Sequence, residues 1–149
     1  MEELWSEHEL PPFPFWENIE RRPVDQRLSP LSPAPNGATP TVREWARFRP
    51  VPSFEDPFVD AARSLILLDT YGWPAVYRLH RDGAFVAPNL DTSVWFHDLR
   101  ARPEWLLIDH ECLVGAHGLL GVNGRVWDRD GRLLASGGAQ LCCLPVPAG

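Results

Sequence analysis

The stretch Asn89-Leu90-Asp91-Thr92-Ser93-Val94-Trp95-Phe96-His97 has a period of two, because apolar or β-branched residues occupy every second position in it. This period is typical of a strand with one face on a core, and it excludes a helix. In such a strand Leu90, Thr92, Val94 and Phe96 face the core, and the residues at odd positions face the other way. We therefore expect Asn89 and Thr92 on opposite faces.

The same alternation recurs in a series of four segments that continues almost to the C-terminus. Their ranges are 85–97, 104–114, 119–127 and 133–144. Short connections rich in Pro, Gly and Asp join them and predict hairpins. The clearest is Asp128-Arg129-Asp130-Gly131, in which Gly131 can supply the positive φ of a type I turn with a bulge. The four segments predict an antiparallel meander.

Two strands and one helix are predicted upstream of the meander. Residues 17–24 and 41–49 suit strands. The helix has Asp56 as a good N-cap, Pro57 in its first turn, and apolar residues at helical spacing after it. Its apolar stripe ends at Asp69, and Gly72 is expected to stop the helix.

This order of elements predicts an α+β protein in which one long helix covers one face of a curled antiparallel sheet. The expected topology is a single hot-dog fold, with about six strands wrapped around the helix. A length of 149 residues suits one domain. We expect an irregular tail at residues 1–12 and a domain at 13–149 that contains a Pro-rich loop at 28–40.

The composition argues against nucleic acid as a partner. The formal net charge is -6 and the sequence pI is near 5.3, whereas phosphate binding needs clustered Lys and Arg. The nearest approach to a basic patch is Arg21 with Arg22, and we expect both to be solvated on an edge strand.

The cysteines and the N-terminus exclude further classes. Cys112, Cys142 and Cys143 are an odd number without metal-ligand spacing, so we expect reduced, buried strand residues and neither disulfides nor a zinc site. No secretory leader and no apolar run of the roughly 18 residues of a membrane helix is visible. A cytoplasmic location without a membrane partner is the resulting expectation.

Several segments carry a resemblance to a known family. They are Asp91–His97 (Asp-Thr-Ser-Val-Trp-Phe-His), Glu104-Trp105-Leu106-Leu107, Trp127–Ser136, the helix end Leu67-Leu68-Asp69, and Ile19–Val24 (Ile-Glu-Arg-Arg-Pro-Val). In their order and spacing they resemble the C-terminal hot-dog half of the acyl-CoA thioesterase II family. The resemblance spans most of the chain, although no single motif is as specific as a metal signature.

The resemblance implies hydrolysis of an acyl thioester, with coenzyme A entering as part of the substrate and with no metal or redox cofactor. In that family two hot-dog units sit side by side in one polypeptide about twice as long as this one. An acid, a hydroxyl or amide side chain and a glutamine there hold the attacking water. The chain is then a fragment of a double hot dog, a half that works with a separately encoded partner, or a unit that forms a homodimer.

Asp69 matches the acid of the family. A carboxylate on the apolar stripe of a helix end should have its charged form disfavoured by burial, which suits a general base. The alternative interpretation is an aspartate that turns outward at a frayed helix end and caps the turn from Thr70 to Gly72.

Asn89 and Gln140 are the other candidates that the resemblance implies. Asn89 falls where the family usually has Ser or Thr, and its amide could orient a water; otherwise it is a turn residue after Pro88. Gln140 would hold the water or the thioester oxygen, but the stretch before it is one residue longer than the family pattern. A bulge at Gly137-Gly138 would turn Gln140 toward the site, and without one Gln140 is an exterior strand residue.

The remaining polar residues are expected to be structural. Asp91, Ser93 and His97 line one strand and cannot form a triad alone. His110 and His117 are isolated, which favours surface or hairpin positions over metal ligands. A doubtful Asn89 and a shifted Gln140 also fit a second hypothesis, a non-catalytic hot dog that pairs with another unit or binds an acyl chain. A third hypothesis, hydratase chemistry on the same fold, lacks its His-bearing helix motif here.

Overall fold

The computed structural model of the protein describes residues 14–24, 39–77 and 85–145. The predicted tail at residues 1–12 and residues 28–38 of the predicted Pro-rich loop lie outside the described residues.

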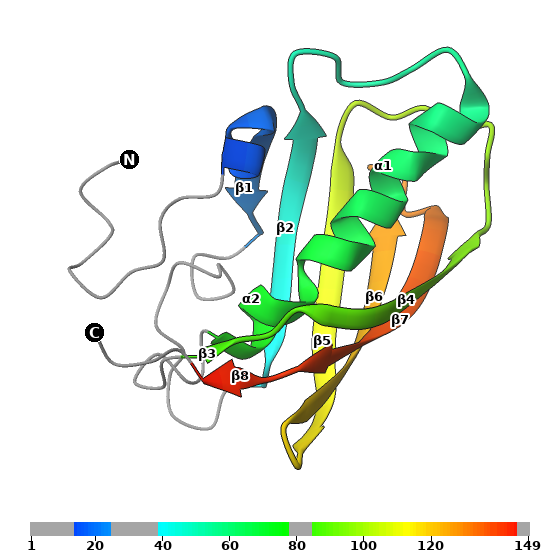
Figure 1. Ribbon diagram of the computed structural model, residues 1–149. Coiled ribbons are helices and arrows are strands. Elements are labelled where there is room, and N and C mark those ends of the chain that lie inside the picture. Colours follow the sequence, from blue (N-terminus) through cyan, green and yellow to red (C-terminus); the bar gives the residue numbers. More distant parts are fainter. Residues whose placement is uncertain (1–13, 25–38, 78–84, 146–149) are drawn as a thin grey trace.

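A six-stranded antiparallel sheet with the strand order β1-β2-β5-β6-β7-β4 forms the body of the protein (Figure 1). Its strands are β1 (Ile19–Pro23), β2 (Thr41–Phe48), β4 (Asn89–Phe96), β5 (Leu106–Ala116), β6 (Leu119–Trp127) and β7 (Leu133–Cys142). A short 3-10 helix, η2 (Pro14–Asn18), precedes β1, and β3 (Phe85–Val86) pairs with β8 (Leu144–Pro145). The predicted sheet of six strands is confirmed.

The predicted meander is correct for three of its four strands. β5, β6 and β7 follow one another as hairpins, and Gly131 in the β6–β7 turn has the expected positive φ of 78°. β4 pairs with β7 instead of β5, so it forms one edge of the sheet while β1 forms the other. Residues 97–105 therefore cross the end of the sheet and are not a tight hairpin.

The long helix α1 (Pro57–Thr70) begins as predicted. The Asp56 carboxylate accepts hydrogen bonds from the backbone N–H groups of Phe58 (2.8 Å) and Val59 (3.1 Å). α1 ends at Thr70 with Tyr71 as its C-cap, so the helix stops next to Gly72 as predicted, and a second helix, α2 (Gly72–Tyr77), begins at Gly72. A Cβ at position 72 would lie only 3.0 Å from Val122 Cγ2, so glycine allows this close approach to β6.

The inner face of the curved sheet is covered by α1, as Figure 1 shows. Leu67, Leu68 and Tyr71 at the end of the helix are buried against the sheet. Their partners on the strands include Val42, Ala46, Ile108, Val126 and Ala135. Burial of each large apolar side chain contributes about 1.5 to 3 kcal/mol, so this layer holds the last turn of α1 in place.

Polar groups are also buried on this face, which corrects two predictions. His110 lies in the core with 1% of its surface exposed and is not a surface residue. Arg21 is not simply solvated, because its Nη2 atom pairs with Glu44 Oε1 at 2.6 Å and Glu44 is 1% exposed. Arg22 is exposed as expected, and His117 occupies the β5–β6 turn.

The cysteines of the described residues are free, with Cys112 buried and Cys142 and Cys143 half-buried. No cluster of His, Cys, Asp and Glu in the described part of the chain could hold a metal ion. Neither α1 nor α2 is long and apolar enough to cross a membrane.

Candidate active site

Asp69 stands in the last turn of α1, and two side chains of β4 converge on it. Its Oδ1 atom accepts hydrogen bonds from Asn89 Nδ2 at 2.6 Å and from Thr92 Oγ1 at 2.8 Å. Asn89 Nδ2 also donates to the backbone carbonyl of Asp69 at 2.8 Å. The structure thus joins two predicted candidates, Asp69 and Asn89, and adds Thr92.

A β-bulge brings Asn89 to this face. Thr92 pairs with Ala139 and Asn89 with Leu141, but the register shifts between Asn89 and Asp91. The extra residue, Leu90, returns Asn89 to the inner face beside Thr92, against the simple alternation expected from the sequence. Thr92 was expected to face inward as a β-branched core residue. A hydroxyl on the core face was the only feature of the sequence that could have indicated its hydrogen bond to Asp69.

The hydrogen bonds hold the carboxylate in one orientation. Asn89 Nδ2 donates to the backbone carbonyl and to Oδ1 of Asp69 and also lies 3.3 Å from Thr92 Oγ1, which itself donates to Oδ1. Asp69 Oδ2 has no hydrogen-bond partner among the described residues and so can accept a proton from a bound water. Asp69 is exposed in the single chain, so the burial expected for this group is not provided by this chain alone.

The structure does not bring Gln140 to the site. Pairing through Gly137 and Gly138 is regular against both β4 and β6, so the bulge that Gln140 needs is absent from β7. Gln140 is exposed on the outer face, between buried Ala139 and Leu141, and its backbone N–H donates to Asp91 Oδ1 at 3.1 Å. Ala139 occupies the inner position opposite Thr92.

The other strand residues form no triad. His97 Nε2 lies 2.8 Å from Ser136 Oγ on the exposed part of the sheet, and no acid contacts this pair within the described residues. Ser93 lies on the outer face with Asp91, away from Asp69.

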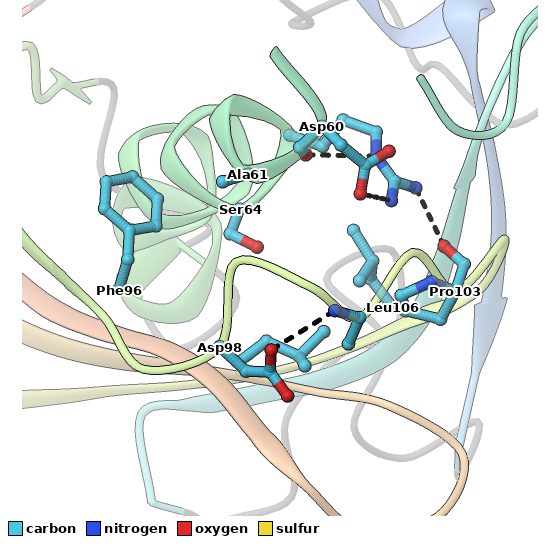
Figure 2. Close-up of a pocket in the computed structure, with 10 residues that line it drawn as sticks. Asp60, Ala61, Ser64, Phe96, Asp98, Pro103 and Leu106 are labelled. Atoms are coloured by element: carbon cyan, nitrogen blue, oxygen red, sulfur yellow. Dashed lines mark hydrogen bonds and ion pairs between the residues drawn. The ribbon is translucent and has the colours of Figure 1, made fainter. Parts of the chain in front are cut away.

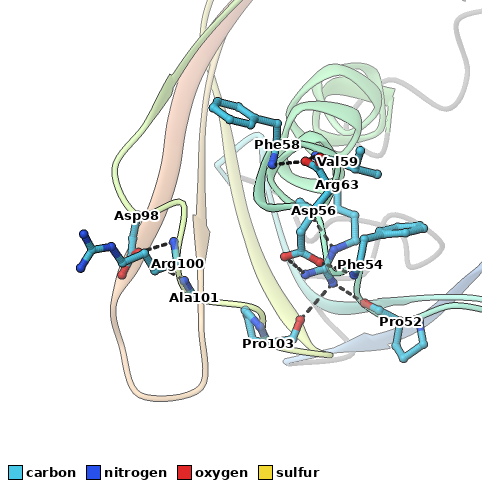
Figure 3. A network of polar contacts seen from close by, with 11 residues as sticks. Pro52, Phe54, Asp56, Phe58, Val59, Arg63, Asp98, Arg100, Ala101 and Pro103 are labelled. Atoms are coloured by element: carbon cyan, nitrogen blue, oxygen red, sulfur yellow. Dashed lines mark hydrogen bonds and ion pairs between the residues drawn. The ribbon is translucent and has the colours of Figure 1, made fainter.

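The N-terminal half of α1, away from Asp69, has no cavity large enough for a substrate among the described residues, and its buried contacts anchor the helix to the rest of the protein. The cavity in Figure 2 holds only about 10 Å³, room for roughly one water and not for an acyl group. Beside it the Arg63 guanidinium pairs with Asp60 at 2.6 Å, and both side chains are at least 96% buried. Figure 3 shows Arg63 reaching the backbone carbonyls of Pro52 and Pro103. These contacts fix the helix that carries Asp69.

A family model of the acyl-CoA thioesterase C-terminal domain matches residues 2–144 of the chain. The chain belongs to this family. The match covers the sheet, α1 and the three residues Asp69, Asn89 and Thr92. Membership accounts for the resemblance seen in the sequence. We found no match among curated proteins.

Solved structures share the fold. An acyl-CoA thioesterase II from Mycobacterium marinum is 22% identical, with a TM-score of 0.73, and the match covers 91% of this chain and 52% of that one. A putative thioesterase from Novosphingobium aromaticivorans is 26% identical, with a TM-score of 0.65, covering 86% and 44%. A Streptococcus mutans protein bound to acetyl CoA is 16% identical, with a TM-score of 0.58, covering 74% and 86%. The chain spans about half the length of the first two relatives.

Proposed function

We propose that this hot-dog unit hydrolyses acyl-CoA thioesters with a water activated by Asp69. The observation that carries the proposal is the carboxylate held at Oδ1 by Asn89 and Thr92, with Oδ2 left open to a water. Membership in the acyl-CoA thioesterase C-terminal domain family and the acetyl CoA in a solved neighbour support the choice of substrate.

In the proposed reaction Asp69 Oδ2 takes a proton from the water as its oxygen attacks the thioester carbonyl carbon. The tetrahedral intermediate then collapses, the carbon–sulfur bond breaks, and the coenzyme A thiolate takes the proton back from Asp69. Products are a carboxylic acid and coenzyme A. Asn89 and Thr92 orient the base; Gln140 has no part in this step, since its side chain is on the outer face.

A second hot-dog unit is part of the proposal. β4 is an edge strand, so one side of its backbone is unpaired by this sheet. Exposed apolar side chains of α1 and β4 flank that edge, with Phe58 at 73%, Leu65 at 40% and Phe96 at 43% exposure. A second unit along β4, as a homodimer or a separate chain, would cover this surface and enclose Asp69. It would also supply a donor for the intermediate's oxyanion, because the hydrogens of Asn89 and Thr92 are already used.

The second candidate function is a non-catalytic hot dog that pairs with another unit or binds an acyl chain. The observation that favours it is Ala139, which places a methyl group on the inner face opposite Thr92 while the neighbouring amide of Gln140 points outward.

Release of free thiol from a panel of acyl-CoAs tests the two functions. Asp69→Asn keeps an oxygen that can accept from Asn89 and Thr92 but removes the base, so we expect a loss of about 100-fold or more in kcat. Asp130→Asn in the exposed β6–β7 turn is the matched control and should keep full activity. No turnover by the wild type, alone or with added partner units, would favour the non-catalytic role. Equal turnover by Asp69→Asn and wild type would remove Asp69 from the mechanism.

A further inference from the structure

The outer face of the sheet carries a groove on the opposite side from α1 and Asp69. It has a volume of about 400 Å³ and is lined by Trp45, Leu107, Trp127, Arg43 and Arg129 together with Asp109, Asp128 and Gly131. The two tryptophans and the leucine form one row across the sheet, because Trp45 pairs with Leu107 and Leu107 pairs with Trp127. Residues directly opposite each other on neighbouring strands share a face of the sheet, so the two indoles lie on either side of Leu107.

The spacing of the two tryptophan positions matches one turn of a polyproline II helix. Neighbouring strands are about 4.8 Å apart, so the backbone positions of Trp45 and Trp127, two strands apart, are roughly 9.6 Å from each other. A polyproline II helix rises about 3.1 Å per residue with three residues per turn, so prolines at i and i+3 lie on one side at about 9.3 Å. Two such prolines would reach both indoles.

The polar groups of the groove suit the same ligand. A polyproline II backbone leaves its carbonyl groups without internal partners. The indole N–H groups of Trp45 and Trp127 make no hydrogen bond within the described residues and can donate to those carbonyls. Arg43 is already paired with Asp109 at 3.0 Å.

Arg129 supplies a positive charge that favours an acidic residue next to the prolines of the ligand. It is exposed, its guanidinium lies 5.8 Å from the ring centre of Trp105, and it has no ion pair among the residues that the structure describes. An acidic residue beside the prolines would give it a partner.

We propose that this groove binds a proline-rich peptide of another protein, with prolines at i and i+3 and an acidic residue next to them. The two indoles hold the two prolines, and Arg129 binds the acidic side chain. The proposal does not depend on the thioesterase activity, since the groove and Asp69 lie on opposite faces of the sheet.

The probe is a synthetic peptide, Ala-Leu-Pro-Ala-Leu-Pro-Glu-Glu, and its control has both prolines replaced by alanine. Calorimetric titration of the whole chain should give saturable binding of the probe and none of the control. Trp127→Ala should weaken binding about tenfold or more. Trp95→Ala is the matched control, because Trp95 is 61% exposed on the same face but outside the groove, and it should leave binding unchanged.

A measurement on the wild type covers the case in which Trp127→Ala does not fold. The probe should shift the indole N–H resonances of Trp45 and Trp127 in a proton–nitrogen correlation spectrum and leave that of Trp95 in place. Equal binding of probe and control peptide, or shifts confined to other tryptophans, would overturn the proposal.

Two other occupants would also overturn it. The chain has its own prolines at i and i+3, Pro30 and Pro33, so binding of the probe only by the Pro30→Ala, Pro33→Ala variant would assign the groove to the chain itself. A lower solution mass for Trp127→Ala than for the wild type, with no probe binding by either, would assign it to a second copy.

Discussion

His110 should make the protein less stable in mild acid, and His110→Leu should abolish that dependence. The imidazole is buried on the inner face of β5 near Tyr71, with the ring centres 6.1 Å apart. Burial lowers the pKa of His110 from 6.5 to about 3. Neither ring nitrogen has a hydrogen-bond partner among the described residues, so no contact compensates a charge there.

The sign follows from which state binds the proton. In the unfolded chain the pKa of this histidine is near 6.5, so below that pH the unfolded state is protonated while the folded state stays neutral down to about pH 3. Stability is therefore full above pH 6.5 and is lost as the pH falls toward 3. Between pH 7 and pH 5 the loss is about 2 kcal/mol, because the unfolded state gains roughly 1.4 kcal/mol per pH unit once it titrates.

Urea denaturation at pH 7, 6 and 5 measures this loss. Glu20 and Asp98 contribute little in this window, because hydrogen bonds from Arg49 and from the backbone of Arg100 hold the pKa values of the Glu20 and Asp98 carboxyls, respectively, below their usual range. His110→Leu should be at least as stable as the wild type at pH 7, because two unsatisfied buried nitrogens disappear, and should lose little at pH 5.

The matched control is His117→Asn, because His117 lies in the β5–β6 turn with a φ of 54° that asparagine tolerates. It should keep the wild-type drop in stability. The reasoning about His110 is refuted if the wild type is equally stable at pH 7 and pH 5, or if His110→Leu shows the same drop as the wild type.

Three further changes test the site and its support. Thr92→Val removes a 2.8 Å hydrogen bond to Asp69 and should lower kcat about tenfold in the thiol-release assay, with partial recovery in Thr92→Ser; unchanged kcat would show that the hydroxyl does not orient the base. Ala139→Gln places an amide on the inner face opposite Thr92 and should raise turnover of a short acyl-CoA, whereas a fall would mean that the added side chain only blocks the site. Arg63→Leu leaves the Asp60 carboxylate buried without its partner and should lower the free energy of unfolding by about 3 to 5 kcal/mol, and a loss under about 1 kcal/mol in urea would show that the pair is not an anchor.

Local sequence signals predicted the elements that depend on local chemistry. The Asp56 cap and Pro57 located the start of α1, and Gly131 located the last hairpin with its positive φ. The period of two located the strands to within a few residues. Each of these signals acts within one turn or one strand, so no tertiary information was needed.

Features that depend on residues far apart in the sequence could not be predicted from local patterns. β4 pairs with β7, although 89–97 and 104–114 are neighbours in the sequence, because strand order depends on how the whole sheet closes around α1. His110 was expected at the surface, yet it lies in the core where Gly124 leaves no side chain in its path. Neither a strand partner nor a small residue on the neighbouring strand can be inferred from the residues around His110.

The candidate site depends on the pairing register of β4 and β7. The hydrophobic pattern shows which residues of a strand share a face, but it does not show where an extra residue turns the following side chains to the other face. One extra residue at Leu90 turns Asn89 inward, and the carboxylate of Asp69 gains its second donor. The extra residue before Gln140 has no matching bulge in β7, so the amide turns outward and Ala139 takes the inner position. The bulge in β4 therefore brings Asn89 to Asp69, whereas the lack of a bulge just before Gln140 in β7 keeps that side chain away from it. In the proposed reaction, a donor for the thioester oxygen has to come from outside the Asp69–Asn89–Thr92 group, and we propose that a second hot-dog unit brings it along the edge of β4 that this sheet leaves unpaired.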